Sequence, residues 1–150
     1  MTYIVWKSSW NTGIHVIDNQ HKRIVDMINE LHEAQQGQKK EAVSNVIEEL
    51  IDYTLSHFAF EETLMEDAQY QFSRAHKKIH ELFIRRVEQY RTRFEQGEDV
   101  GDQLKELLSR WLINHICNDD VDYVKSVRRN MQQLLEDKGW LSGAMKRFFG

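Results

Sequence analysis

Two pairs of metal-binding residue types lie in the stretch HFAFEETLMEDAQYQFSRAHKKIH, which covers residues 57–80. His57 lies four residues before Glu61, and His76 lies four residues before His80. Side chains four residues apart project from the same side of an α-helix, so each pair could give two ligands to one cation. Imidazole and carboxylate groups together suit transition metals. If this stretch is helical, the spacing predicts a metal site.

The surrounding sequence predicts helices that would carry these pairs. The chain has no proline, and apolar residues recur at intervals of three and four over long stretches, a pattern typical of helices rather than strands. We expect four helices, the first capped by Asp18, over about residues 18–36, 41–66, 72–95 and from 102 onward. Short connections make neighbouring helices antiparallel. The predicted fold is therefore all-α, an up-down-up-down antiparallel four-helix bundle with an additional C-terminal helical extension.

Histidines on the first and fourth predicted helices give every helix at least one inward-facing imidazole. His21 lies on the apolar stripe of the first helix, three residues before Ile24, and His115 ends the apolar stripe of the fourth. In an antiparallel bundle the starts of the first and third helices meet the ends of the second and fourth. The predicted cluster therefore consists of His21, His57, Glu61, His76, His80 and His115.

A core histidine that hydrogen-bonds to other protein groups is the alternative for each of these imidazoles, and for any one alone it is the better interpretation. For the whole set a metal is favoured, because burying several polar groups costs free energy unless each has a partner, and a cation serves them together. His32 is left out as a core or rim residue, because it lies about 16 Å along the helix axis from His21. His15 is left out as a loop residue before the first helix.

The composition indicates a single globular domain in the cytoplasm. Of the 150 residues, 41% are hydrophobic and 29% charged, and no apolar run is long enough for a membrane span or a secretory signal. The single Cys117 cannot form an internal disulfide, which also favours an intracellular protein. At a net charge of −4 the basic residues are scattered among acidic ones, so we expect no nucleic-acid partner. Lys77, Lys78, Arg85 and Arg86 are interpreted as a solvated face of the third helix.

Three segments resemble the motifs of the hemerythrin family, specifically its single-domain bacterial members. Residues 57–80 match H-F-x-x-E-E-x-x-M, followed by a tyrosine and H-x-x-x-H. Upstream, GIHVIDNQHKRI resembles G-I-x-x-I-D-x-Q-H; downstream, WLINHICNDDVDY resembles W-L-x-x-H-I-x-x-x-D-x-x-Y. The resemblance runs in order from about Trp6 to Tyr123. Gln71 departs from it, because the family commonly has proline there, and this affects only the expected shape of the loop.

The resemblance implies a pair of iron ions with a particular ligand set. One iron would take His76, His80 and His115, the other His21 and His57, with Glu61, Asp120 and a solvent-derived oxo or hydroxo group as bridges. Asp120 follows His115 by five residues, which is off-face for a regular helix and predicts a local loosening there. Asp119 and Asp122 are its rivals, and Cys117 is expected to point away from the metals. This ligand set leaves one position open on the second iron.

By the same resemblance, an open position on an imidazole-rich iron pair implies reversible binding of dioxygen. The implied role is storage, delivery (oxygen transport) or sensing of oxygen rather than enzymatic turnover. Ferritin-like oxidases instead use carboxylate-rich irons. The side chains expected to keep water out of the oxygen pocket are Leu112, Trp111, Ile24 and Phe58. A di-iron enzyme, weak oxidase or peroxidase activity, a redox- or nitric-oxide-reactive sensor and an iron- or zinc-storage protein remain as alternatives.

The end of the chain forms a further amphipathic segment. We expect residues 1–138 to make up the bundle with an N-terminal arm, and residues 139–150 to form a helical tail. Its two apolar rows are Trp140, Ala144 and Phe148, and Leu141, Met145 and Phe149. Docking on the bundle or self-association is the favoured interpretation. A partner protein, or an anionic membrane surface contacted through Lys146 and Arg147, is the alternative.

Overall fold

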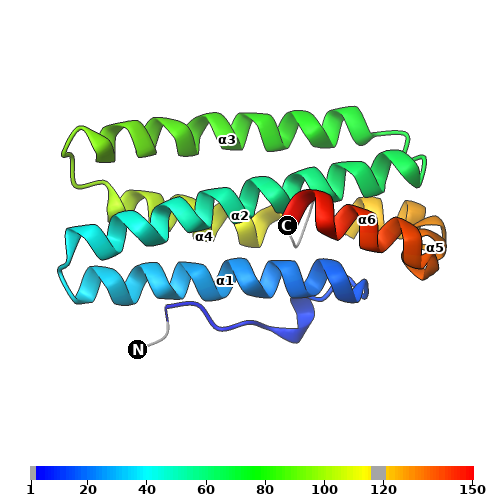
Figure 1. The fold of residues 1–150 in the computed structure, drawn as a ribbon, viewed down its shortest axis with the longest axis horizontal. Helices are drawn as coiled ribbons and strands as arrows, with labels where there is room; N and C mark the ends of the chain where they lie inside the picture. The colour runs from blue at the N-terminus through cyan, green and yellow to red at the C-terminus, as the bar shows by residue number, and fades with distance from the viewer. Residues whose placement is uncertain (1–2, 116–120) are drawn as a thin grey trace.

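A computed structural model describes residues 3–115 and 121–150, with the backbone alone for residues 121–127. The regular structure in these ranges is helical (Figure 1). It comprises a short 3-10 turn η1 (Ser8–Trp10) and the helices α1 (His15–Gln36), α2 (Lys40–Asp67), α3 (Ser73–Glu95), α4 (Gly101–Asn114), α5 (Val121–Glu136) and α6 (Lys138–Phe149). Within the described ranges, no helix has an apolar stretch that could span a bilayer.

The first four helices form an antiparallel bundle. α1 packs on α2 and α4, and α3 packs on the same two helices, so each helix has two neighbours in the bundle. Residues 37–39, 68–72 and 96–100 make the short connections that force successive helices to run in opposite directions. The predicted all-α, up-down-up-down bundle with a C-terminal helical extension is confirmed.

The interior is apolar at the end of the bundle far from α5. Here α1, α2 and α4 contribute five large side chains that are at most 1% exposed: Ile28, Leu31, Ile47, Leu50 and Leu104. They occupy the apolar stripes that the helical periodicity indicated. Fully burying one such side chain contributes about 1.5–3 kcal/mol, so this end supplies much of the packing free energy.

The start of α1 differs from the prediction. The helix begins at His15, so His15 is an exposed helical residue rather than a loop residue, and Asp18 lies within the first turn rather than at the cap. The Asp18 carboxylate accepts hydrogen bonds from the Thr12 backbone N–H (2.7 Å), the Thr12 hydroxyl (2.8 Å) and the Gly13 N–H (3.2 Å). A carboxylate there also complements the positive end of the helix dipole. Asp18 thus fixes the incoming loop.

The N-terminal arm is fastened along α1. The Asn29 side-chain oxygen accepts hydrogen bonds from the backbone N–H of Tyr3 (3.1 Å) and Ile4 (2.8 Å), and the Asn29 amide donates to the Ile4 carbonyl (2.9 Å). Ile4 and Trp10 are buried in the main core. The arm therefore belongs to the packed bundle.

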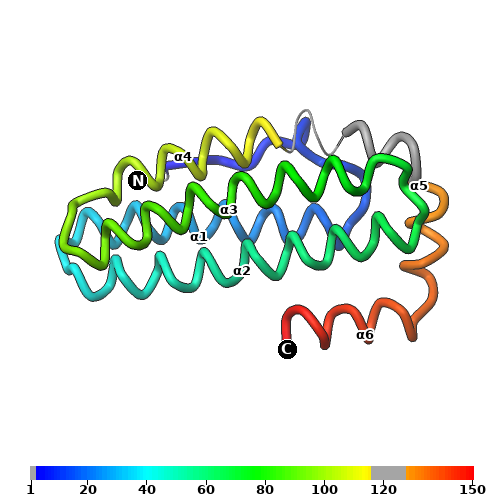
Figure 2. Tube along the Cα trace, turned by 90° about the horizontal axis from the view of Figure 1, so that it is seen from above, coloured from blue at the N-terminus to red at the C-terminus, as the bar shows by residue number. Residues whose placement is uncertain are grey.

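The C-terminal helix docks on the bundle. α6 runs back beside α2 after the turn made by α5 (Figure 2). The Trp140 indole N–H donates to Asp67 (2.6 Å), the ring of Phe60 lies 5.9 Å from that of Trp140 and 6.0 Å from that of Phe149, and Ala144 is buried. The apolar side of α6 thus packs against α2.

Candidate metal centre

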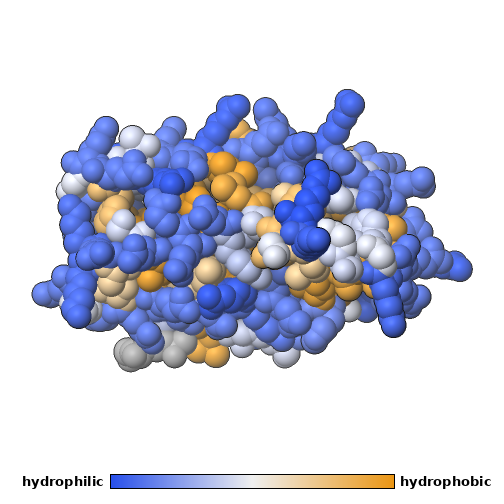
Figure 3. All heavy atoms as spheres, viewed as in Figure 1, coloured by the Kyte–Doolittle hydropathy of each residue, from blue (hydrophilic) through white to orange (hydrophobic). Residues whose placement is uncertain are grey.

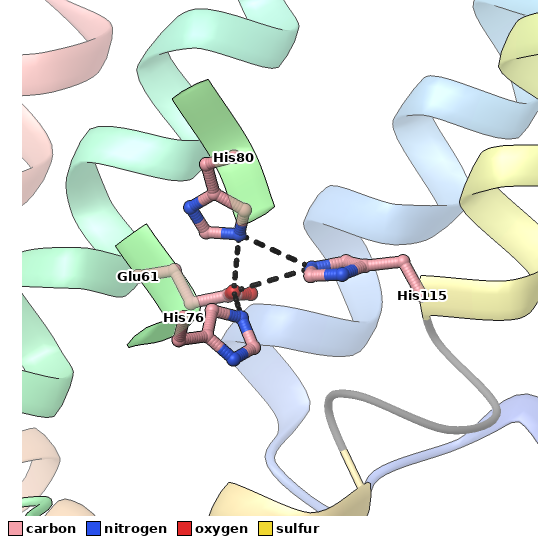
Figure 4. A group of neighbouring side chains, drawn as sticks. All are labelled: Glu61, His76, His80 and His115. Atoms are coloured by element: carbon pink, nitrogen blue, oxygen red, sulfur yellow. Dashed lines mark hydrogen bonds and ion pairs between the residues drawn. The ribbon is translucent and has the colours of Figure 1, made fainter. Parts of the chain in front are cut away.

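Three imidazoles converge on one carboxylate oxygen in the bundle interior. The Oε1 atom of Glu61 lies 2.9 Å from His76 Nε2, 3.2 Å from His80 Nε2 and 3.5 Å from His115 Nε2. The Nε2 atoms of His80 and His115 are themselves 3.2 Å apart. Figure 4 shows these side chains pointing toward one another from α2, α3 and the end of α4. Their ligand atoms lie close enough together to hold one cation.

The second oxygen of Glu61 faces a different pair of histidines. Glu61 Oε2 lies 3.3 Å from His57 Nε2, and the ring of His57 lies 4.8 Å from that of His21 on α1. Ligand atoms of His21, His57 and Glu61 all lie within 4.8 Å of one another, which makes a second group that could hold a metal ion. Glu61 is therefore shared between two sets of imidazoles.

The helical register explains why these residues meet. His57 with Glu61, and His76 with His80, are each one turn apart on α2 and α3, so both members of a pair face inward. His21 lies early in α1 and His115 directly after α4, which places both at the same end of the bundle. His76 is 5% exposed and the other five residues at most 1%. Water is thus largely excluded from the two groups.

Two residues that the sequence analysis missed orient the imidazoles. Gln20 Oε1 lies 2.7 Å from His57 Nδ1, and Glu62 Oε1 lies 3.4 Å from His80 Nδ1. Because amide and carboxylate oxygens accept hydrogen bonds, Nδ1 of each ring is assigned the proton, which leaves the Nε2 lone pair directed at the centre. Gln20 and Glu62 each adjoin a proposed ligand in the sequence, but no spacing rule distinguishes them from other polar residues.

These contacts set the charge of the centre. Burial by itself raises the pKa of Glu61, but hydrogen bonds with His115, His57, His76 and His80 outweigh it and hold that pKa well below 4.5. Glu61 is therefore an ionised carboxylate near neutral pH. Burial lowers the pKa of His80, whereas hydrogen bonds with Glu61 and Glu62 raise it, and the net result is a pKa above 6.5.

The donor set fits a transition-metal cation. With one proton on Nδ1, His57 needs a second proton on Nε2 to hydrogen-bond to the anionic Glu61 Oε2 at 3.3 Å, and a metal ion could take the place of that proton. Only a positive charge between them, a proton or a metal, makes that arrangement favourable. Five imidazoles around one carboxylate are too nitrogen-rich for magnesium or calcium. The donor set therefore suits nitrogen-coordinated transition metals such as iron.

Comparison with known protein families agrees with this chemistry. The model of the family described as "Hemerythrin HHE cation binding domain" matches residues 12–126. The chain belongs to the hemerythrin family. A bacteriohemerythrin of Pseudomonas aeruginosa (strain LESB58) is 71% identical, and one of Stenotrophomonas maltophilia (strain R551-3) is 52% identical, each over 100% of both chains. A wild-type hemerythrin crystal structure matches with a TM-score of 0.77 at 30% identity, over 81% of this chain and 95% of that one.

Aromatic rings enclose the centre of this hemerythrin. The Phe58 ring stacks on His80 with centroids 4.0 Å apart, and the Trp111 ring stacks on His115 at 4.3 Å. Two further residues expected in the oxygen pocket, Ile24 and Leu112, are 2% and 4% exposed in the core cluster that also contains Phe58. Each lies three residues, about one helical turn, from a histidine of the centre.

The structure describes His32, which was left out of the predicted site, but it does not describe the predicted carboxylate ligand Asp120. His32 lies at the far end of this hemerythrin bundle, partly buried, where its Nδ1 is 2.8 Å from Lys105 Nζ and its ring stacks on Tyr3. It takes no part in the centre, as expected of a rim residue. Asp120, its rival Asp119 and Cys117 lie outside the described residues, as does the side chain of Asp122.

Proposed function

We propose that this member of the hemerythrin family holds two iron ions and binds dioxygen reversibly. One iron would be held by His76, His80 and His115, the other by His21 and His57, with Glu61 and Asp120 contributing to both. The observation that carries this proposal is the position of Glu61, whose two oxygens face two separate sets of buried imidazoles. When bound, the iron pair supplies a reversible exchange of electrons with dioxygen.

The surrounding residues favour binding over chemical conversion of oxygen. Cleavage of dioxygen needs protons, and once a metal has displaced the proton of His80 the centre is poor in proton donors. The depressed pKa of Glu61 keeps its carboxyl group unprotonated. The Nδ1 proton of His57 is directed at Gln20, away from the centre. Phe58, Ile24 and Leu112 are buried around it and limit the access of water. We therefore propose oxygen storage, delivery or sensing rather than enzymatic turnover.

The proposal is tested by optical spectroscopy of the iron-loaded chain. The protein is loaded with ferrous iron without air, exposed to air and then degassed, while iron is counted per chain. We expect two irons and a charge-transfer band that appears with oxygen and disappears when oxygen is removed. Zinc-loaded protein is the matched control and should give no band. Immediate irreversible oxidation would support an enzyme or redox sensor instead, and iron uptake without any oxygen-dependent band would support a store.

A further inference from the structure

The outer side of α3 carries an unusual set of exposed apolar side chains. Phe72, directly before the helix, is 55% exposed, Ile79 is 37% exposed and Leu82 is 52% exposed. Of the large apolar side chains exposed in the described part of the chain, the two others, Tyr3 and Val5, lie on the N-terminal arm. Spacings of seven and three residues place Phe72, Ile79 and Leu82 on one side of the helix, along about 15 Å of its length.

The exposed surface of α3 is also rich in basic residues that make no ion pair in the described part of the chain. α3 contains seven lysines and arginines against three glutamates, whereas the whole chain has 20 basic and 24 acidic residues. Five of these basic residues are exposed and make no ion pair within the described part of the chain: Arg74, Lys77, Lys78, Arg85 and Arg86. Leu82 has Lys78 one turn before it and Arg85 and Arg86 one turn after it. Basic and apolar groups are thus interleaved.

This side forms a long convex edge rather than a groove. α3 runs along one margin of the bundle (Figure 1), and long hydrophilic side chains project from the corresponding edge of the space-filling view (Figure 3). A straight helix lying along an edge can touch a flat surface over its whole length. α3 turns its main apolar face, with Phe83 and Val87, into the bundle, so its contribution to a membrane contact would be the exposed apolar side chains among its basic residues.

We propose that the outer side of α3 binds the surface of an anionic phospholipid membrane. Lys78, Arg85 and Arg86 would contact the lipid phosphates, while Ile79 and Leu82 enter the headgroup region. The rest of the chain is acidic overall and opposes this contact. Helices packed behind α3 lie about 8–10 Å further away, which is comparable with the Debye length of about 8 Å at physiological ionic strength. Screening therefore reduces the effect of the distant charges more than that of the charges on α3.

Two other partners for this surface, and one other surface for the membrane, fit less well. A specific protein interface buries about 800 Å² on each side with close shape complementarity, and one convex helix edge offers little of that. A second copy of this chain, facing α3 with α3, would bring like charges together. The tail α6, the sequence-based candidate for membrane contact, has its apolar side packed against Tyr53 and Phe60 of α2. The membrane surface is therefore assigned to α3.

Vesicle co-sedimentation of the full chain tests the proposal. Vesicles contain equal parts phosphatidylglycerol and phosphatidylcholine, or phosphatidylcholine alone, and salt is raised from about 50 to about 500 mM to shorten the Debye length. We expect binding to the anionic vesicles that weakens with salt, and none to the neutral vesicles. No binding at low salt, or equal binding to both vesicle types, would overturn the proposal. Because iron-free protein is measured beside iron-loaded protein, the outcome is independent of the proposed oxygen binding.

Charge-reversal pairs locate the surface. Arg85→Glu with Arg86→Glu should weaken binding to anionic vesicles about tenfold or more. Two control pairs make the same change in net charge at exposed positions elsewhere. One is Lys39→Glu with Lys40→Glu at the start of α2, and the other is Lys146→Glu with Arg147→Glu on α6. Both should bind much more tightly than the α3 pair. Equal weakening by a control pair, or loss only with the α6 pair, would contradict the assignment to α3.

Apolar variants separate insertion from a purely electrostatic contact. Ile79→Ser with Leu82→Ser should weaken vesicle binding severalfold at moderate salt, whereas Val5→Ser, at a position 69% exposed on the arm, should not. Thermal unfolding by circular dichroism verifies that each variant is folded. If the anionic vesicles are not bound but polyglutamate is, and binding depends on Arg85 and Arg86, the surface serves an acidic protein and the membrane proposal is wrong.

Discussion

The two ends of the bundle use the same helical positions for opposite purposes. At one end the inward positions hold Leu31, Leu50 and Leu104, which pack without polar groups. Toward the other end the equivalent stripes hold imidazoles arranged around Glu61, before a second apolar cluster that includes Ile17 and Leu64. The apolar end stabilises the fold whatever the solution contains, whereas burying the polar end costs free energy that a bound cation offsets. Stability and function are thus separated along one set of helices. Substitutions at the apolar end and at the metal centre can test this separation.

The largest effect is expected from the shared carboxylate. Glu61→Gln keeps the size of the side chain but removes the charge that both imidazole sets face, so the variant should lose most of its iron. Iron analysis after loading measures this, and the iron-dependent rise in melting temperature should disappear with it. The neighbouring Glu62→Gln is the matched control and should retain iron near the normal stoichiometry, with weaker affinity. A Glu61→Gln protein that still holds two irons would contradict the shared-carboxylate assignment.

A core truncation should affect the apolar end alone. Leu50→Ala, at a position 0% exposed, should lower the free energy of unfolding by about 2–5 kcal/mol, because it removes packed atoms and leaves a cavity. Denaturant unfolding measures the change, which should be similar in iron-free and iron-loaded protein. Leu82→Ala, on the exposed side of α3, should change stability by only about 0.5 kcal/mol. A marked loss of iron from folded Leu50→Ala protein would show that the two ends are coupled.

Removing an orienting contact should weaken the metal centre more modestly. Gln20→Leu deletes the acceptor 2.7 Å from His57 Nδ1 and should reduce metal affinity about 10–100-fold, since the imidazole loses its fixed orientation. Competition with a chelator of known affinity measures this. Asn19→Leu, at the adjacent exposed position of α1, is the control and should bind metal normally. Equal affinities of the two variants would show that Gln20 does not orient His57.

The two ends should also respond differently to pH. His80 has a raised pKa, so its interaction with Glu61 stabilises the metal-free fold below pH 6.5 and that contribution is lost as pH rises through the folded pKa. The lowered pKa of Glu61 gives stability that is present above 4.5 and is lost as pH falls. A metal must displace the His80 proton, so the stabilisation by cobalt, an air-stable substitute, should grow as pH rises above 6.5. Calorimetric melting with and without cobalt measures the difference, and a pH-independent difference would contradict proton competition.

The smallest effect is expected at the tail. Trp140→Phe keeps the ring that packs on Phe60 but loses the hydrogen bond to Asp67, and should cost about 1 kcal/mol. Chemical denaturation of this variant, of Asp67→Ala and of the double variant gives the coupling between the two groups. Additive effects of the two substitutions would show that the hydrogen bond contributes nothing to docking.

Most of the fold and much of the candidate site followed from periodicity and register. Apolar spacing identified four helices, and antiparallel register placed His21 and His115 beside the two pairs on α2 and α3. Asp18 was misplaced because a carboxylate can satisfy backbone N–H groups either at the cap or, as observed, from within the first turn. Local spacing does not distinguish these two arrangements.

Contacts between side chains of different helices could not be predicted from periodicity and register. Gln20 and Glu62 matter because of imidazoles on other helices, and no pattern within α1 or α2 reveals those partners. The basic residues of α3 looked scattered in the sequence, whereas their exposure beside Ile79 and Leu82 depends on which side of the helix the bundle leaves uncovered. Both features need the tertiary arrangement.

The two oxygens of Glu61 face different sets of imidazoles, and this affects the order in which two metal ions would bind. An ion held by Oε1 would fix the side chain in the rotamer that also presents Oε2 to His57 and His21, so the first ion prepares the place of the second. Singly occupied molecules would then be scarce during loading, and uptake would be steeper than for two independent sites. One side chain would thereby couple the two proposed sites.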